Sequence, residues 1–326
     1  NTWPEVASTA HVQLDLMVQH QLTGPNEPEH ALGRLEGLAM QLARIQQQSG
    51  QGLEGLKLES PQLVVFAADH GIAVDGLGQP PSRQTPDLVH QLLAGQWPMA
   101  VFARSQQVEL SVVDCGLAAN MGAHDRLLMR KIAHGTRNAR LSGAMTLDQA
   151  HAAMRAGMEI GDTLRGNMVI CTGIGVGSHL SAALVLSRLT DSPVRDLLVS
   201  GPDMDPDTLA HLMVIAQGAL GRHRELSEPI EVLAAMGGFE IAMMVGVMLV
   251  AASKRHLLMV DGMAACAALM LASRIATPVT DYCVFCRSQG HRGLDKALHL
   301  FRASALLELG MDSTDGTGAT LAWPLV

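Results

Sequence analysis

The chain has 326 residues, 48% of them hydrophobic, which is enough for one large domain and a small appendage. It carries 23 Lys and Arg against 31 Asp and Glu, a formal charge of −8, and no basic cluster stands out. This balance argues against nucleic acid as a partner. The five cysteines are odd in number and lie mostly in apolar runs, which predicts free thiols and a reducing cytoplasm rather than a disulfide framework.

The first 60 residues are expected to form a small helical segment. Residues 32–48 have helical periodicity, and a Gln- and Gly-rich stretch follows them. Residues 1–12 lack a positive region followed by an apolar core, so no secretory signal is expected. The longest uncharged apolar run, residues 241–252, is too short to span a bilayer and predicts a buried helix.

Five apolar runs predict buried strands, and helical stretches separate them. Strands that are apolar on both faces are typical of a parallel sheet covered by helices on both sides. We therefore predict an α/β protein, a three-layer α/β/α fold with a mostly parallel, Rossmann-like sheet and a small helical subdomain. The predicted units are an N-terminal segment (1–60), a core (61–293) and a C-terminal helix and tail (294–326), with the subdomain formed by the first unit alone or with the last. The predicted strands are residues 63–68, 108–113, 168–171, 196–200 and 257–260.

The most informative local pattern is a glycine turn after the third of these strands. Gly173, Gly175, Gly177 and Ser178 separate that strand from residues 180–189, which are helix-like. Glycines let backbone N–H groups approach an anion, and a helix N-terminus adds partial positive charge, so the turn favours a phosphate. Many α/β proteins use the same turn only to pack a strand against a helix. Both interpretations stay open on this pattern alone.

Polar residues follow each of the five predicted strands, as in Asp69-His70 after the first and Asp261 after the last. A single Asp after a strand most often caps a helix or forms a turn. Ligands of parallel sheets bind at the carboxyl ends of the strands, so five polar endings at one edge predict a site there.

The pair Cys283 and Cys286, with His291 beyond, has half of a zinc-binding spacing. No second Cys or His pair with ligand spacing follows it. We therefore interpret these cysteines as buried thiols and expect no metal site.

Characteristic segments follow one another along the chain: F-A-A-D-H-G at residues 66–71, K-I-A-H-G-T-R-N at 131–138, G-G-F-E-I-A at 237–242, V-D-G at 260–262, and L-G-M with D-G-T-G-A at 309–311 and 315–319. Together they resemble the nicotinate-nucleotide:dimethylbenzimidazole phosphoribosyltransferase family over residues 66–325. The resemblance implies transfer of phosphoribose from nicotinate mononucleotide to a benzimidazole, giving nicotinate and α-ribazole phosphate for the lower ligand of cobalamin. It also implies a homodimer with the site near the subunit contact, and neither a cofactor nor a metal.

The resemblance further implies roles for single residues. Asp315 takes the place of the family's glutamate base, one methylene shorter, although an acid there also suits a simple Asp-Gly turn. The expected phosphate and nucleotide contacts are Gly173, Gly175, Gly177, Ser178, Gly201, Asp261 and Gly262, and the expected base contacts are Gly78, Asp87 and Thr314.

Departures from the family pattern fall at the expected site. Cys171 and Thr172 replace the Glu-Met of the family's phosphate loop, which removes a carboxylate. Residues 199–203 lack the family's arginine and place Asp203 near the expected phosphate. These changes favour an alternative function, that of a catalytically silent homologue which binds a nucleotide or base in a regulatory or carrier role. Asp315 favours the enzyme.

Three further polar residues adjoin these motifs. His70 is interpreted as a hydrogen-bonded wall residue, and Glu240 as a structural residue at the rim or at a helix start, rather than as catalysts. His179, directly after the glycine turn, is a candidate for direct contact with the anion.

Overall fold

A single six-stranded sheet, with the strand order β3-β2-β1-β4-β5-β6, organises the structure, a computed structural model. Every neighbouring pair of these strands is parallel. The strands are β1 (Gln62–Ala68), β2 (Glu109–Gly116), β3 (Leu127–Met129), β4 (Met168–Ile174), β5 (Leu257–Val260) and β6 (Cys283–Phe285). The structure describes residues 2–26, 28–47, 51–77, 84–200, 204–286, 292–309, 311 and 315–326.

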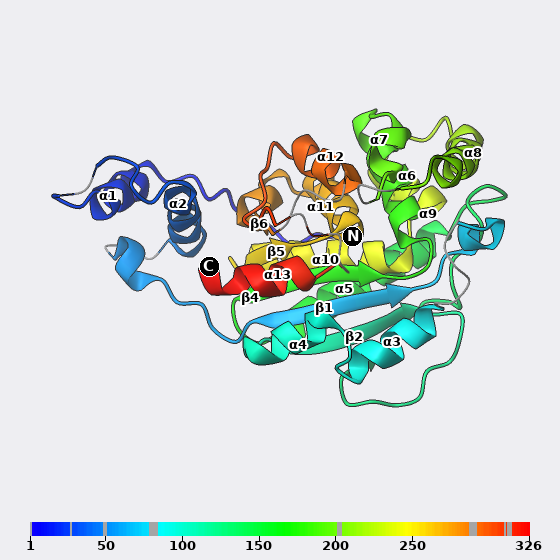
Figure 1. The fold of residues 1–326 in the computed structure, drawn as a ribbon, viewed down its shortest axis with the longest axis horizontal. Helices are drawn as coiled ribbons and strands as arrows, with labels where there is room; N and C mark the ends of the chain where they lie inside the picture. Colours follow the sequence, from blue (N-terminus) through cyan, green and yellow to red (C-terminus); the bar gives the residue numbers. More distant parts are fainter. Residues whose placement is uncertain are drawn as a thin grey trace.

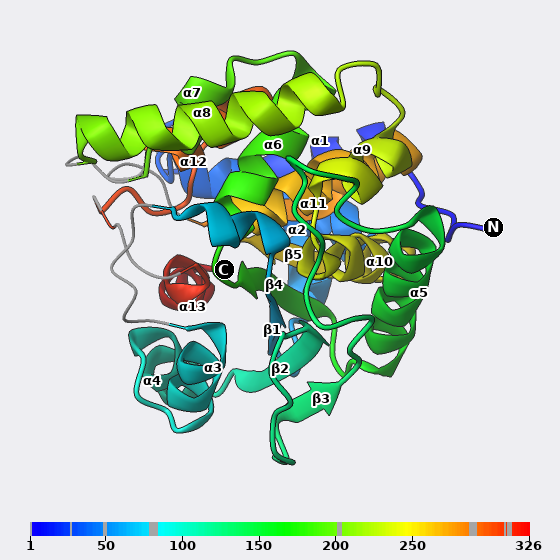
Figure 2. The same cartoon turned by 90° about the vertical axis from the view of Figure 1, so that its right-hand side faces the viewer.

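Helices cover both faces of this sheet, which confirms the predicted three-layer α/β/α architecture (Figures 1 and 2). On one face lie α3 (Thr85–Leu93), α4 (Pro98–Ser105) and α13 (Thr317–Ala322). The other face is covered by α5 (Leu147–Thr163), α10 (Phe239–Ser253) and α11 (Met263–Ile275). The remaining helices of the core are α6 (Ser178–Thr190), α7 (Val194–Leu198), α8 (Pro206–Arg222), α9 (Pro229–Met236) and α12 (Arg292–Leu300).

The predicted buried helix over residues 241–252 is confirmed as α10, which is buried along nearly its whole length. It packs so closely on α5 that the backbones of the two helices are in contact where they cross. A Cβ at Gly157 would lie 1.9 Å from the Met243 carbonyl oxygen, and one at Gly246 would lie 2.1 Å from that of Met154. Glycine is therefore required on both helices where they cross. Among the described residues, no helix combines the length and apolarity needed to cross a membrane.

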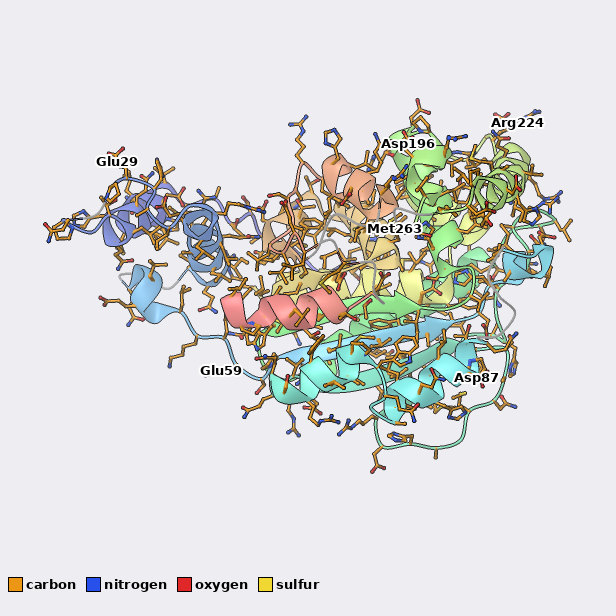
Figure 3. The ribbon with its side chains drawn as sticks, in the orientation of Figure 1. Glu29, Glu59, Asp87, Asp196, Arg224 and Met263 are labelled. Atoms are coloured by element: carbon orange, nitrogen blue, oxygen red, sulfur yellow. The ribbon has the colours of Figure 1, made fainter. Side chains whose placement is uncertain are left out.

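The strand prediction for residues 196–200 is wrong, because residues 194–198 form the short helix α7. Val194, Leu197 and Leu198 are buried, and their spacing of three and four residues is helical. Asp196, labelled in Figure 3, lies on this helix. The predicted strand began at residue 196 and so left out Val194. Without Val194 the helical spacing is not visible, and the apolar residues that remain have the pattern of a short strand. The other four predicted strands are confirmed, whereas the three-residue strands β3 and β6 were not predicted.

The helices α1 (Val12–Leu22) and α2 (Arg34–Gln46) lie beyond the amino ends of the strands (Figure 1), and Leu42 and Ile45 of α2 belong to the main core. They form a small apolar core of their own, made of Leu14, Val18 and Ala43, with an Arg44–Asp15 ion pair at 2.7 Å beside it. The helix predicted within residues 32–48 is confirmed as α2, which spans Arg34–Gln46. The division into three units stays a prediction, and α13 of the last unit packs on α4 of the core.

Candidate active site

A cavity of about 850 Å³ lies at the carboxyl ends of β1 and β4, the edge that faces the viewer in Figure 2. The strand order reverses between these two neighbours, because β1 leads outward to β2 whereas β4 leads outward to β5. The loops after β1 and β4 therefore diverge and leave a crevice, which is where open α/β sheets bind their ligands.

The end of β4 and the glycine turn that follows it form one wall of the cavity, which Gly173 of the strand and Gly175, Gly177 and Ser178 of the turn all line. Gly175 has φ +155°, and a Cβ there would lie 1.9 Å from the Ala68 carbonyl oxygen. Gly177 has φ +92°, which L side chains rarely adopt. Because these positions require glycine, the turn presents backbone atoms without side chains to the cavity.

Ser178 is the first residue of α6, and its backbone N–H donates to the Gly175 carbonyl oxygen at 3.1 Å, which closes the turn at the helix N-terminus. Ser178 is 6% exposed, and its Oγ has no hydrogen-bond partner among the described residues. A buried hydroxyl that lines a cavity without a partner needs a ligand or water to satisfy it. Helix dipole, backbone N–H groups and this hydroxyl together suit an anion.

Asp315 lines the same cavity, half-buried, directly before α13. The structure therefore brings the predicted base and the predicted phosphate turn together, although more than 130 residues separate them in the chain. Gly316 follows in the left-handed conformation, with φ +96°, and its N–H donates to Asp261 Oδ2 at 2.8 Å. Gly262 lies against the Asp315 carboxyl, since a Cβ at Gly262 would come within 2.1 Å of Asp315 Cγ.

Behind the glycine turn, His70 Nε2 and Glu240 Oε2 are 2.7 Å apart, and both side chains are almost fully buried. His70 packs directly against the turn, because a Cβ at Gly177 would lie 2.9 Å from the His70 Cβ. His70 is therefore hydrogen-bonded, as predicted, but like Glu240 it is not among the residues that line the cavity. Glu240 lies in the first turn of α10, where a negative charge is favourable, and it is not among the residues that line the cavity. The structure thus supports the structural interpretation of Glu240.

Other predicted contacts lie differently. Asp87, labelled in Figure 3, is exposed in the first turn of α3 and is not among the residues that line the cavity. Its neighbour Leu88 lines the cavity, and Thr85 Oγ1 accepts the Val176 N–H at 3.0 Å. The ring Nε2 of His179 lies 3.0 Å from the Leu197 carbonyl oxygen, although the residue also lines the cavity. The predicted contacts Gly78, Gly201 and Thr314 lie outside the described residues.

The rest of the wall consists largely of apolar side chains that the sequence did not single out. They come from five elements and loops of the core, and their pattern in the sequence does not distinguish them from core residues. Met263, labelled in Figure 3, is one of them. The apolar lining includes Leu77, Leu88, Trp97, Ile174, Leu180, Met204, Leu212 and Met263.

Cys171, which replaces a carboxylate of the family's loop, is fully enclosed within β4. Burial raises the pKa of its thiol to about 12, so it carries no charge at neutral pH. All five cysteines are buried free thiols, as predicted. In the described part of the chain, no group of three or more His, Cys, Asp or Glu side chains is arranged to hold a metal ion.

Comparison with known proteins gives a consistent picture. A family model described as phosphoribosyltransferase matches residues 9–326. The nicotinate-nucleotide–dimethylbenzimidazole phosphoribosyltransferase of Cupriavidus taiwanensis is 40% identical over 95% of this chain and 89% of its own, and that of a Janthinobacterium species is 33% identical over 98% and 92%. The crystal structure of the Thermus thermophilus protein of that name superposes with a TM-score of 0.88 at 27% identity, covering 97% of this chain and 94% of its own. The chain therefore belongs to the nicotinate-nucleotide–dimethylbenzimidazole phosphoribosyltransferase family, which makes it a glycosyltransferase.

Proposed function

We propose that the protein transfers phosphoribose from nicotinate mononucleotide to 5,6-dimethylbenzimidazole or a related azole base, releasing nicotinate and forming α-ribazole 5′-phosphate for the lower ligand of cobalamin. The observation that carries the proposal is the presence of Asp315 and the Ser178 turn on the walls of one cavity. Its volume of about 850 Å³ falls in the range of small-molecule sites, and its apolar walls suit flat aromatic bases.

The chemistry needs one base and one anion site. One azole nitrogen attacks the anomeric carbon, while the electrons of the breaking glycosidic bond return to the pyridinium nitrogen, so nicotinate leaves without a proton at that nitrogen. The other azole nitrogen loses its proton, and we assign this proton to the Asp315 carboxylate. Attack opposite the leaving group inverts the anomeric carbon and gives the α-product. The Ser178 hydroxyl and the α6 N-terminus hold the phosphate.

Further proposals concern assembly and location. We propose a homodimer, supported by the family to which the chain belongs, and a cytoplasmic location, supported by the buried free thiols. Small-molecule substrates, rather than nucleic acid, agree with the acidic charge balance. Sedimentation velocity tests the dimer, because a single species near the mass of one 34.6 kDa chain would contradict it.

The decisive test of the activity is Asp315→Asn, which keeps the shape of the side chain but removes its basicity. Purified protein is incubated with nicotinate mononucleotide and a panel of benzimidazoles, purines and phenols, and nicotinate release is followed by chromatography. We expect release that depends on the added base and falls by about a hundredfold or more in the variant, within the usual contribution of a general base. Asp148→Asn, an exposed acid at the start of α5, serves as the matched control.

The outcome also separates the enzyme from a silent homologue. Absence of nicotinate release with every base, together with calorimetric binding of nicotinate mononucleotide, would establish a binding protein instead. Release that is equal in Asp315→Asn and in the unmodified protein would assign the base to another residue.

A further inference from the structure

The tail that carries Asp315 is held to the end of β5 by a buried carboxylate. Asp261 Oδ2 accepts the N–H groups of Gly316 at 2.8 Å and of Ala319 at 3.0 Å, and Asp261 is 2% exposed. These N–H groups belong to the start of α13, where intrahelical partners are missing. Asp261, which directly follows β5, thus caps the N-terminus of α13. Its carboxylate accepts charge-assisted hydrogen bonds from the N-cap residue Gly316 and from Ala319 at the end of the first turn.

The neighbour of Asp261 leaves room for the Asp315 side chain. Gly262 has φ +107°, and a Cβ there would lie 2.1 Å from both Cγ and Oδ2 of Asp315. The Asp315 carboxyl therefore rests directly on the Gly262 backbone. Asp261 itself is also held in place, since Thr172 Oγ1 donates to its backbone carbonyl oxygen at 3.3 Å, which joins the end of β4 to the same point.

We propose that Asp261 is a positioning residue for the transfer reaction, which holds the tail so that Asp315 points into the cavity, and that Gly262 supplies the space for its carboxyl. The inference rests on the proposed role of Asp315. It gives Asp261 a different task from the direct nucleotide contact that the family resemblance implies. A displacement of the base by about 1 Å is enough to cost on the order of a hundredfold in rate, so a loosened cap lowers catalysis without removing any reacting group.

The test compares Asp261→Ala, Asp261→Asn, Asp315→Asn and the double variant Asp261→Asn/Asp315→Asn. We expect kcat to fall about a hundredfold in Asp261→Ala. The fall is smaller, about tenfold, in Asp261→Asn, because the amide oxygen still accepts hydrogen bonds but without charge. The KM for nicotinate mononucleotide stays within about twofold of its original value, since uniform binding is unchanged. The double variant is as slow as Asp315→Asn alone, because Asp261 acts through Asp315.

A matched control is Asp114→Asn. Asp114 is another fully buried acid, near the end of β2, and its Oδ1 accepts the Leu117 N–H at 2.9 Å. This variant is expected to lose stability but to keep kcat within about twofold. If Asp114→Asn lowers kcat as much as Asp261→Asn does, then the loss of activity in Asp261→Asn is a consequence of general destabilisation. The positioning role of Asp261 would then be refuted.

Two results overturn the proposal on kinetic grounds. A raised KM for nicotinate mononucleotide with unchanged kcat in Asp261→Asn would mean that Asp261 contacts the nucleotide, and additive losses in the double variant would mean that it acts independently of Asp315.

Hydrogen exchange separates failure of this proposal from failure of the proposed function. The Gly316 and Ala319 amides are expected to exchange at least tenfold faster in Asp261→Ala than in the unmodified protein, whether or not the protein is active, because their acceptor is gone. If the unmodified protein releases no nicotinate, the proposed function fails, and unchanged exchange of the two amides would then also refute the cap.

Discussion

His70 and Glu240 form a hydrogen-bonded pair that is almost completely excluded from water, with side-chain exposures of 1% and 0%. The second oxygen, Glu240 Oε1, has no hydrogen-bond partner among the described residues. Removal of one partner from such a buried pair leaves the other uncompensated. We therefore expect Glu240→Ala to lower the free energy of unfolding by about 3–5 kcal/mol, measured by urea denaturation.

The control for this prediction is the exposed pair of Arg130 and Glu159, in which the Glu159 side chain is 66% exposed. Glu159→Ala should change the free energy of unfolding by no more than about 1 kcal/mol, because water screens the exposed charges. Equal losses of unfolding free energy in Glu159→Ala and Glu240→Ala would show that the buried pair of His70 and Glu240 contributes no more to stability than the exposed pair.

Burial also governs the cysteines. It raises the pKa of Cys171 from its ordinary value of 9.0 to about 12 and raises that of Cys115 and Cys283 well above 9.0. Unfolded thiols lose their protons at lower pH than these folded thiols, so the stability that they contribute is complete below about pH 9 and is lost as the pH rises toward 12. Urea midpoints should therefore fall between pH 9 and 10.5 in the unmodified protein and fall less in Cys171→Ala. An equal fall in both would contradict the prediction.

At the scale of elements, the glycine turn between β4 and α6 connects packing with binding. Gly177→Ala forces φ +92° on a residue with a side chain and brings a Cβ within 2.9 Å of the His70 Cβ. We expect the variant to lose about 1–3 kcal/mol of stability, as for other residues held in strained backbone conformations, and to bind nicotinate mononucleotide more weakly by calorimetry.

Gly221→Ala is the matched control for the turn. Gly221 lies near the end of α8, and a Cβ there would meet no atom within 4 Å. Alanine has the higher helix propensity, so this variant should be as stable as the unmodified protein or more stable by up to about 1 kcal/mol. If both alanine variants behave alike, the left-handed conformation at Gly177 is not the cause of the loss.

At the scale of the whole molecule, apolar burial is uneven. Strands β1 and β4 are buried at every residue, whereas α1 buries only Leu14 and Val18 in its small separate core. Regions with few buried apolar contacts open at lower free energy than the core. Amide hydrogen exchange should therefore proceed by local opening in residues 12–22 and only by global unfolding in β1. Equal protection in the two segments would contradict this picture.

The cavity itself is a whole-molecule feature, built from the ends of β1, β4 and β5 and the start of α13. The sequence predicted that polar residues gather at one edge, because parallel strands place their carboxyl ends together. It did not predict the apolar wall that includes Leu88 and Met263. Apolar residues that line a cavity have the same sequence pattern as those that fill a core.

What the sequence determined by itself is local and periodic. Apolar runs specified four of the strands, helical periodicity specified residues 32–48, and the spacing of Gly173, Gly175 and Gly177 specified a bare turn, because each of these depends on neighbouring residues alone. The motifs also determined the family.

Only the tertiary structure decided the rest. It showed that residues 194–198 form a helix, that Asp87 is exposed and does not line the cavity, and that the Asp261 carboxylate accepts hydrogen bonds from the backbone of the tail. The physical reason is that the direction of a side chain and the partner of a buried charge depend on segments that are distant in the chain and adjacent only once the sheet has formed.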